Sequence, residues 1–542
     1  MRITIRKGLI FIMSALICAV ALMGGCGSKN NDGKELNTNE KDGKNELVTI
    51  RWFQEARGQD PDKDRVLQEI QKELNVKIEF VAAPAGQESE KLNLMVSTGE
   101  QLDLITAFDI DQAAIQWAKD DFILSYDNYM ETGDYPRIKA ILDSDMYKSL
   151  KVNDKSYFKP QPLWPGLRGY VIRKDWLDNL GLQIPTTIDE YYNVLKAFRY
   201  DDPDKNEKDD TYGFFVAEPQ GINSFGYICR AYAVCAAWGG DWTELPDGTI
   251  SQFSVTDAAK EAFQFIKKCY DEDLFNKSFV NEKDAEGKVE DLVTQGKLGI
   301  TDLSQPANLE NKIKDAGANV EVAYLPPLKG VNGTPANLPH TGGYWSCHIL
   351  PKTCKSPERV LDLLEWALSK EGRELTMFGI KGIHFNDFKS DGDNRIYDIN
   401  KDEMQKDWNT SDYGYMHPLA WGGFNYCENA YVPIDENGFD LDEAFKKINR
   451  WMTTDAAGGN LSANWYSLNA QYATMFPLQG AIADEIRVDQ KLIDIEIQGR
   501  TKCIVEPAAM FEENWSEWVE KWKAAGGDDL NKRANDYYEA NK

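Results

Sequence analysis

The stretch VTIRWFQEARGQDPDKDRVLQEIQKELNVKIEFVAAPAGQESEKLNLMVSTGEQLDLITA, residues 48–107, decides the fold class. Residues 48–53 and 76–80 alternate apolar and polar side chains and are rich in strand-forming residues, and 103–107 is a third short apolar run. Two segments with helical spacing separate these runs, so the order is strand, helix, strand, helix, strand. That order predicts a parallel sheet covered by helices, with ligand-binding loops at the carboxyl ends of the strands.

The first of these helices has both a start signal and an apolar face. Asp60-Pro61 suits an N-cap followed by the first helical residue, because aspartate accepts backbone hydrogen bonds there and proline has no N–H to satisfy. The side chains expected to face the sheet are Val66, Leu67, Ile70 and Leu74.

A second unit of strands and helices follows Trp164. Residues 169–173 form a predicted strand, and Thr187 with Glu190 forms a capping box that opens a helix. Residues 320–328 and 344–350 are further predicted strands, and Ser356-Pro357 opens an amphipathic helix. A chain of 542 residues exceeds the roughly 250–300 residues at which single cores stop growing, so we expect at least two domains.

The charge and composition exclude several classes of protein. Lys and Arg total 61 against 88 Asp and Glu, and the net charge of −27 disfavours binding to nucleic acid, whose phosphates would be repelled. A hydrophobic content of 42% is too high for a disordered chain. The nine cysteines are scattered and contain no CxxC pair, so we expect no disulfide scaffold.

The N-terminus has the pattern of an export signal. Three basic residues precede an apolar run over residues 9–23, which is short for a membrane span. Gly24-Gly25 then leads to Cys26, and this string resembles the lipobox of bacterial lipoproteins, in which the cysteine carries the lipid. We therefore predict a lipoprotein signal peptide at 1–25 and a flexible tether at 26–47; an ordinary signal peptide is the alternative.

The sequence as a whole resembles the bacterial extracellular solute-binding proteins of the sugar-binding class, the lipoproteins that serve ABC transporters. The stretches that carry the resemblance are 92–109, 172–198, 202–214, 296–300, 356–385 and 518–529. The resemblance implies an α/β fold of the periplasmic-binding-protein type, with two discontinuous lobes and a ligand cleft between them. On this basis we expect lobe 1 to comprise 48–160 plus 330–380, and lobe 2 to comprise 161–329 plus 381–542.

An acidic loop over residues 202–210 is a candidate calcium site. Asp202, Asp204, Asn206, Lys208 (through its carbonyl) and Asp210 stand at alternating positions, as calcium ligands do in an EF-hand loop. Position 12 of the pattern is Gly213 instead of a bidentate glutamate, so a strict EF-hand is excluded. Alginate-binding relatives hold a structural calcium in such a loop. A solvated acidic turn is the alternative, and we expect no organic cofactor.

Aromatic side chains are the expected sugar contacts, because the C–H faces of sugar rings pack on indole and phenol rings. Tryptophans beside glycines in loops suit a cleft better than tryptophans on helix faces, although packing in the core is the alternative for each. The predicted ligand-binding residues are Trp52, Phe53, Asp109, Trp164, Trp238, Trp242, Trp345 and Trp421.

The resemblance implies a receptor, and the sequence motifs give no support to an enzyme. GxxxxGK[ST], HExxH and Gly-x-Ser-x-Gly motifs are all absent from the sequence. We expect a monomeric, lipid-anchored protein on the outer face of the membrane that captures an oligosaccharide, or another small polar ligand, for ABC permease subunits. An exported glycoside hydrolase or lyase is the main alternative, since two carboxylates suffice for that chemistry. A surface adhesin is a third.

Overall fold

The computed structural model describes most of the chain beyond residue 45. The described residues are 46–54, 63–83, 87–107, 110, 112–162, 169–216, 225–234, 242–282, 286–303, 306–339, 344–391, 394–407, 469, 472–474 and 484–541. The predicted signal peptide, Cys26 and nearly all of the tether lie outside them. Within the described residues, no helix is both long enough and apolar enough to cross a bilayer.

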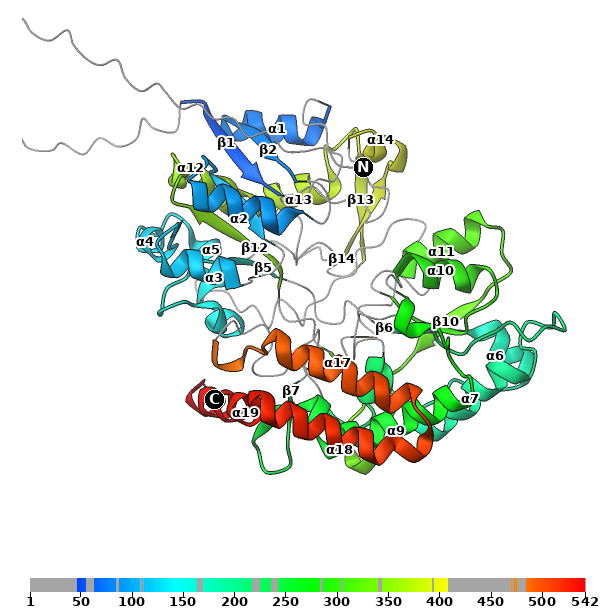
Figure 1. Ribbon diagram of the computed structural model, residues 1–542. Coiled ribbons are helices and arrows are strands. Elements are labelled where there is room, and N and C mark those ends of the chain that lie inside the picture. The colour runs from blue at the N-terminus through cyan, green and yellow to red at the C-terminus, as the bar shows by residue number, and fades with distance from the viewer. Residues whose placement is uncertain are drawn as a thin grey trace, which may run out of the picture. The chain divides into compact units, whose positions relative to one another are not determined.

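The first sheet contains the three strands that residues 48–107 predict. Its hydrogen-bonded order is β2-β1-β3-β12-β4, and β5 pairs with β12. The parallel arrangement is confirmed, because β1 runs parallel to both β2 and β3. β12 comes from much farther along the chain and joins β3 in antiparallel fashion (Figure 1). The strands are β1 (Val48–Phe53), β2 (Val76–Val81), β3 (Leu104–Ala107), β4 (Ile123–Leu124), β5 (Lys159–Pro162) and β12 (Tyr344–Pro351).

Helix α1 (Arg65–Leu74) begins later than the sequence predicts. Asp60-Pro61 lies outside the described residues, whereas Asp64 has an extended backbone and its carboxylate accepts the Leu67 N–H at 2.9 Å. Asp64 is therefore the N-cap, since its side chain satisfies a backbone donor that the first helical turn leaves open. The predicted apolar face is confirmed for Val66, Leu67 and Ile70, which are buried.

A first core draws on two separate stretches of the sequence. Its buried residues run from Ile50 to Phe158 and again from Cys347 to Phe385. The helices that pack here include α1, α2 (Glu88–Thr98), α3 (Gln112–Lys119), α5 (Pro136–Asp143), α12 (Pro357–Ala367) and α13 (Lys370–Phe378).

The hairpin β13 (Phe385–Asp391) and β14 (Asn394–Ile399) and the helix α14 (Lys401–Asp407) also belong with the first core. Phe385 is one of its buried residues, and Arg65 of α1 donates through Nε and Nη2 to the Asp407 carboxylate at 2.7–2.9 Å. His384 Nε2 lies 2.6 Å from the same carboxylate. The prediction assigns residues beyond 380 to the other lobe, whereas Phe385, His384 and Asp407 contact residues of the first core.

The second sheet has three strands in the order β10-β6-β9, and both pairs are antiparallel. β6 (Gly169–Arg173) matches its predicted range. β10 (Val322–Leu325) is shorter than the predicted 320–328, since Pro326 and Pro327 have no N–H to continue the ladder. β9 (Ile300–Leu303) follows α10 (Glu286–Thr294), and α10 and α11 (Pro306–Asp315) supply a small cluster around Val171.

A second core covers the other face of this sheet. Its buried residues run from Ile172 to Leu328 and again from Ile486 to Tyr538. The capping box of α7 (Ile188–Tyr200) is confirmed, with Thr187 and Glu190 bonding each other's backbone N–H. The other elements of this core include α6 (Lys174–Leu180), α8 (Gly226–Cys229), α9 (Asp257–Asp271), α17 (Gln490–Val505), α18 (Phe511–Trp522), α19 (Asp528–Asn541) and the pair β7 (Trp242–Glu244) and β8 (Ile250–Gln252). Helices α17 and α18 lie side by side in Figure 1.

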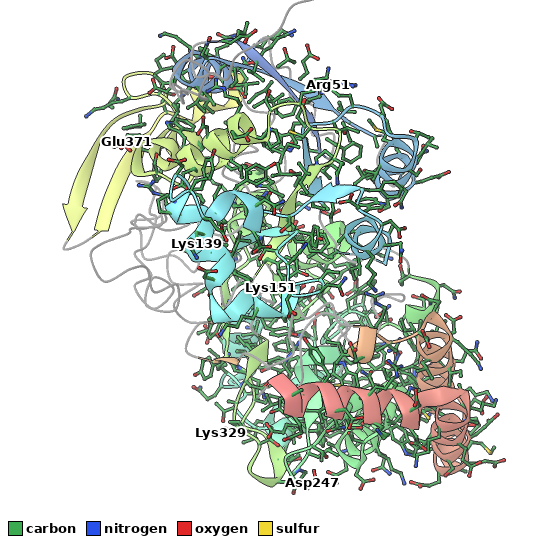
Figure 2. All side chains as sticks on the ribbon, turned by 90° about the vertical axis from the view of Figure 1, so that its left-hand side faces the viewer. Arg51, Lys139, Lys151, Asp247, Lys329 and Glu371 are labelled. Atoms are coloured by element: carbon green, nitrogen blue, oxygen red, sulfur yellow. The ribbon has the colours of Figure 1, made fainter. Side chains whose placement is uncertain are left out.

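Charged side chains project from the surface, as Lys139, Asp247 and Lys329 do in Figure 2. The described cysteines Cys229, Cys269, Cys347, Cys354 and Cys503 are free thiols.

Candidate ligand-binding site

A pocket lined mostly by aromatic side chains opens beside the second sheet. It is small, with a volume of about 30 Å³, and is walled by β6, β9, α7, α8 and the segment 211–216. The lining residues are Tyr170, Tyr191, Phe214, Phe215, Phe225, Tyr227, Ile228, Ile300, Thr301 and Asp302.

The base of the pocket is a packed group of rings. The Tyr227 ring lies 4.6 Å from the Tyr170 ring and 5.0 Å from the Tyr191 ring, measured between centroids. The Tyr227 hydroxyl donates to the Pro326 carbonyl at 2.7 Å, which fixes the ring. Burial raises the pKa of Tyr227 and of Tyr191 well above the usual value, so both hydroxyls stay neutral. The base is therefore rigid, apolar and uncharged.

The rim of the pocket offers the groups that a ligand can reach. Tyr170 and Phe215 are only partly buried, and Asp302 is exposed. Tyr170 lies opposite Asp302 in the β6–β9 pairing, so an aromatic ring and a carboxylate come from neighbouring strands. A sugar needs such a combination, because its ring faces are apolar and its edges carry hydroxyl donors.

Trp52 and Phe53, both predicted ligand contacts, lie inside the first core. Trp52 is 0% and Phe53 2% exposed. The Trp52 indole donates to Thr106 Oγ1 at 2.8 Å, and its ring packs on Phe80 and against the edge of His348. Neither ring presents a face to a ligand in this conformation, because neighbouring strands cover both.

The other predicted contacts are divided between the described and undescribed parts of the chain. Trp242 begins β7 and is 4% exposed within the second core, so it packs instead of facing the pocket. Trp345 lies at a bulge of β12 opposite β5, and its side chain is not among those described. Asp109, Trp164, Trp238 and Trp421 lie outside the described residues. The structure does not bring the described members together, since Trp52 and Trp242 belong to different cores.

Sequence reasoning missed Tyr170, Phe215 and Asp302. A search for tryptophans beside glycines overlooks a tyrosine at the start of a strand, although Gly169-Tyr170 has the same local pattern. The pairing of β6 with β9, which brings Asp302 beside Tyr170, joins residues more than 100 positions apart, and no local signal encodes it.

The acidic loop leads directly into the pocket wall. Arg199 of α7 holds the loop through Asp209 and donates to Asp273 at 2.8 Å. Thr211 Oγ1 then donates to the Phe198 carbonyl at 2.6 Å, and residues 211–216 continue to Phe214 and Phe215. The loop and the pocket are therefore parts of one connected segment.

The oxygen atoms of this loop fit a hard cation in their chemistry. Asp204 Oδ1 is buried and accepts no hydrogen bond from any described residue, and the Asn206 amide nitrogen lies 2.8 Å from Asp204 Oδ2 and 3.3 Å from Asp210 Oδ1. Burial, together with nearby Asp202 and Asp210, raises the pKa of Asp204, which a bound cation would reverse. In this conformation no three acidic, histidine or cysteine side chains of the described residues converge as metal ligands.

The comparison with protein families identifies the class of protein to which this fold belongs. The model of the bacterial extracellular solute-binding protein family matches residues 58–374, and the chain belongs to this family. The predicted two-lobed α/β class is confirmed, because solved proteins of this kind share the fold over nearly the whole chain.

Two curated relatives and one solved structure illustrate the family. The chain is 28% identical to the polygalacturonan/rhamnogalacturonan-binding protein YtcQ of Bacillus subtilis, over 94% of this chain and 95% of that protein. It is 26% identical to lipoprotein LipO of the same organism over the full length of both. The substrate-binding protein FusA of a Streptococcus pneumoniae ABC transporter, solved as an EF-hand mutant with fructo-nystose, has a TM-score of 0.64 at 20% identity, covering 92% of this chain and 100% of that one.

Proposed function

We propose that this protein is an extracellular receptor that binds an oligosaccharide and delivers it to an ABC-type membrane permease. The aromatic pocket beside the second sheet carries the proposal, because its rim combines a tyrosine, a phenylalanine and a carboxylate in a chain of the solute-binding family. Two relatives support it, since YtcQ is named for binding polygalacturonan and rhamnogalacturonan, and FusA, named for fructooligosaccharide transport, was solved with fructo-nystose.

Recognition in this proposal needs no covalent chemistry. Tyr170 and Phe215 pack against the apolar face of a sugar ring, and Asp302 accepts hydrogen bonds from its hydroxyls. The rigid base formed with Tyr227 keeps these groups in place before the ligand arrives, which lowers the entropic cost of binding. The protein therefore acts as a carrier and leaves the glycan intact.

The two lobes follow the two cores in this proposal. Lobe 1 contains its predicted N-terminal part. It also contains the β13–β14 hairpin and α14 up to Asp407, because Asp407 bonds Arg65 of α1. Lobe 2 contains the pocket. A ligand that contacts both lobes would shift the population towards a closed state, which the permease recognises. The predicted ligand contacts Asp109, Trp164, Trp238, Trp345 and Trp421 remain part of the proposal.

A lipid on Cys26 attaches this receptor to the outer face of the membrane, as the name of the lipoprotein LipO implies for that relative. Residues 26–47 then serve as the tether that lets a monomeric receptor reach its permease.

A structural calcium ion in the acidic loop completes the proposal. Asp202, Asp204, Asn206 and Asp210 would hold it with side-chain oxygens and Lys208 with its carbonyl, and the buried Asp204 Oδ1 supports this assignment. FusA, which was solved as an EF-hand mutant, gives a precedent for such a loop in a similar fold. The ion would stabilise the conformation of the segment that leads to Phe214 and Phe215.

Isothermal titration of the mature protein against a panel of oligosaccharides tests the proposed function. The panel contains oligogalacturonates, rhamnogalacturonan fragments and fructo-oligosaccharides, and mass spectrometry of the recovered sugar follows each titration. We expect 1:1 binding of at least one series with its mass unchanged. Absence of binding throughout, or recovery of shortened sugars, would overturn the proposal, and the second result would favour a hydrolase or lyase.

A further inference from the structure

His384 lies at the base of the β13–β14 hairpin and connects this hairpin to α1. Its side chain is fully buried, and its carbonyl accepts the Asn400 N–H at 2.8 Å, just after β14 ends. Its imidazole Nε2 lies 2.6 Å from the Asp407 carboxylate of α14. Arg65, the first residue of α1, donates to the same carboxylate through its backbone N–H and its guanidinium. One imidazole and one carboxylate therefore join the hairpin, α14 and α1.

The hydrogen bonds of His384 determine which of its two ring nitrogens carries the proton. Nδ1 lies 2.8 Å from the backbone nitrogen of Ile380, and because a backbone N–H can only donate, Nδ1 must accept. The proton is therefore on Nε2, which donates it to Asp407. The ring also packs directly against Gly379, where a Cβ would lie 2.3 Å from Nδ1. The site is therefore built around the neutral imidazole in one orientation.

A second proton on His384 would break this arrangement. It would sit on Nδ1 and point at the Ile380 N–H, so a buried hydrogen bond would become a contact between two donors. Among the described residues, the charged side chains that face the ring are Arg65 of α1 and Asp407 and Glu403 of α14. The Arg65 guanidinium bonds both carboxylates, so it already compensates their negative charge. Burial accordingly lowers the pKa of His384, although Asp407 opposes the shift.

We propose that His384 is an acid-sensitive switch, which holds the hairpin and α14 on α1 while it is neutral and loosens this attachment when it is protonated. The switch is a conformational property of the first region of the fold and does not depend on which ligand the protein binds. When the hairpin base opens, the imidazole reaches water and titrates near its usual pKa of about 6.5, whereas the closed base binds the proton more weakly. The closed base is therefore favoured most above about pH 6.5, and a lower pH shifts the population towards the open base.

NMR spectra of the wild-type protein with 15N-labelled histidine test the protonation state. The chain has four histidines, so single His→Gln replacements assign each imidazole signal by its loss. For His384 we expect the nitrogen shifts of the neutral Nε2–H tautomer at about pH 7.5. The same shifts should persist at about pH 6, where an exposed imidazole is mostly protonated. An Nδ1–H tautomer, or titration of His384 at the usual pKa, would overturn the inference.

Hydrogen exchange then tests the opening itself. Between about pH 7 and about pH 5.5, and after correction for the chemical exchange rate, the amides of β13 and β14 should exchange up to about eightfold faster. This ratio is the one that linkage gives for a group with an open-state pKa of about 6.5 that stays neutral in the closed state.

His384→Gln cannot take up the proton, so its hairpin should show no such acceleration. The matched control is His348→Gln, which replaces the other buried histidine of the described residues and should keep the acceleration in the hairpin. A melting curve checks that each variant folds. Exchange of the wild-type hairpin that does not accelerate in acid would overturn the inference. Acceleration that persists in His384→Gln, or that is lost equally in His348→Gln, would also overturn it.

Discussion

The two sheets differ in how they use their polar and aromatic side chains. In the first sheet, Trp52 is buried against Thr106 and His348. Gln161 Nε2 in turn lies 2.6 Å from His348 Nε2. In the second sheet, Tyr170 packs on Tyr227 but stays partly open, and a pocket begins at its ring. Rings of similar chemistry therefore serve as packing in one region and as an accessible surface in the other. Composition alone does not separate these roles, whereas strand pairing does.

Trp52→Ala should have the largest effect and should act on stability. Removing a fully buried tryptophan leaves a cavity and takes a hydrogen-bond donor from the Thr106 hydroxyl, at a cost of about 3–5 kcal/mol in the free energy of unfolding. Urea unfolding measures this cost. A variant that kept its stability but lost sugar binding would show that Trp52 is a ligand contact after all.

Removing calcium should have the second-largest effect and should lower the melting temperature of the protein. An ion present at about 100 times its dissociation constant stabilises the folded state by about 2.7 kcal/mol, so full chelation should lower the melting temperature by about 5–10 °C. Asp204→Asn should reproduce the shift, because it weakens the buried oxygen ligand.

The matched control for the loop is Asp247→Asn. Asp247 is an exposed turn residue whose carboxylate accepts hydrogen bonds from the N–H and the hydroxyl of Thr249 in the same turn, so its loss should leave the response to chelation intact. Identical melting curves before and after metal removal in the wild-type protein would exclude the ion.

Tyr170→Ala should act mainly on ligand affinity, whereas Trp52→Ala should act mainly on stability. Loss of a partly exposed ring should weaken oligosaccharide affinity about 10- to 50-fold, corresponding to the burial of one aromatic face, with a small change in melting temperature. Tyr192→Ala is the control, since Tyr192 lies on α7 next to Tyr191 but bonds Glu272 away from the pocket lining. Equal affinities of Tyr170→Ala and wild type would place the ligand elsewhere.

The smallest expected effect is a difference between the two sheets in how strongly acid destabilises them. Among the described residues, the histidines His348 and His384 both belong to the region of the first core. Burial, and then the charge of Lys159, lowers the pKa of His348 well below 6.5. Burial also lowers the pKa of His384, although Asp407 opposes the shift.

The sign of the pH effect follows from these depressed values. Below about pH 6.5 the unfolded chain takes up protons at both histidines while the folded chain does not, so stability falls as the pH falls. Hydrogen exchange at about pH 7 and about pH 5.5 should show faster opening of β12 than of β6 at the lower pH. His348→Gln should reduce that difference. Equal acceleration in both strands would contradict the assignment.

The sequence predicts local elements well and long-range pairing poorly. The period-2 and helical patterns of residues 48–107 correctly predict β1, β2 and β3, and Thr187 with Glu190 correctly predicts the start of α7. These features depend on neighbours in the chain. The predicted start of α1 is too early, because Asp60 and Asp64 both carry N-cap chemistry and only the tertiary structure selects one.

The site depends on information that local patterns do not hold. The position of Trp52 at the end of a strand predicts a place in a cleft, but its ring is buried against Phe80 and His348. Tyr170 and Asp302 meet through the β6–β9 pairing, and Arg230, next to α8, bonds the Tyr170 hydroxyl. Each of these contacts joins residues tens to hundreds of positions apart.

Equilibrium dialysis of the mature protein against a labelled pectic oligosaccharide gives the most direct check, when the sugar is recovered and weighed by mass spectrometry afterwards. Our account predicts saturable retention by the wild-type protein, much weaker retention by Tyr170→Ala, and recovery of the sugar at its original mass from both. Retention of neither this nor any other glycan, or fragments in the recovered material, would contradict it.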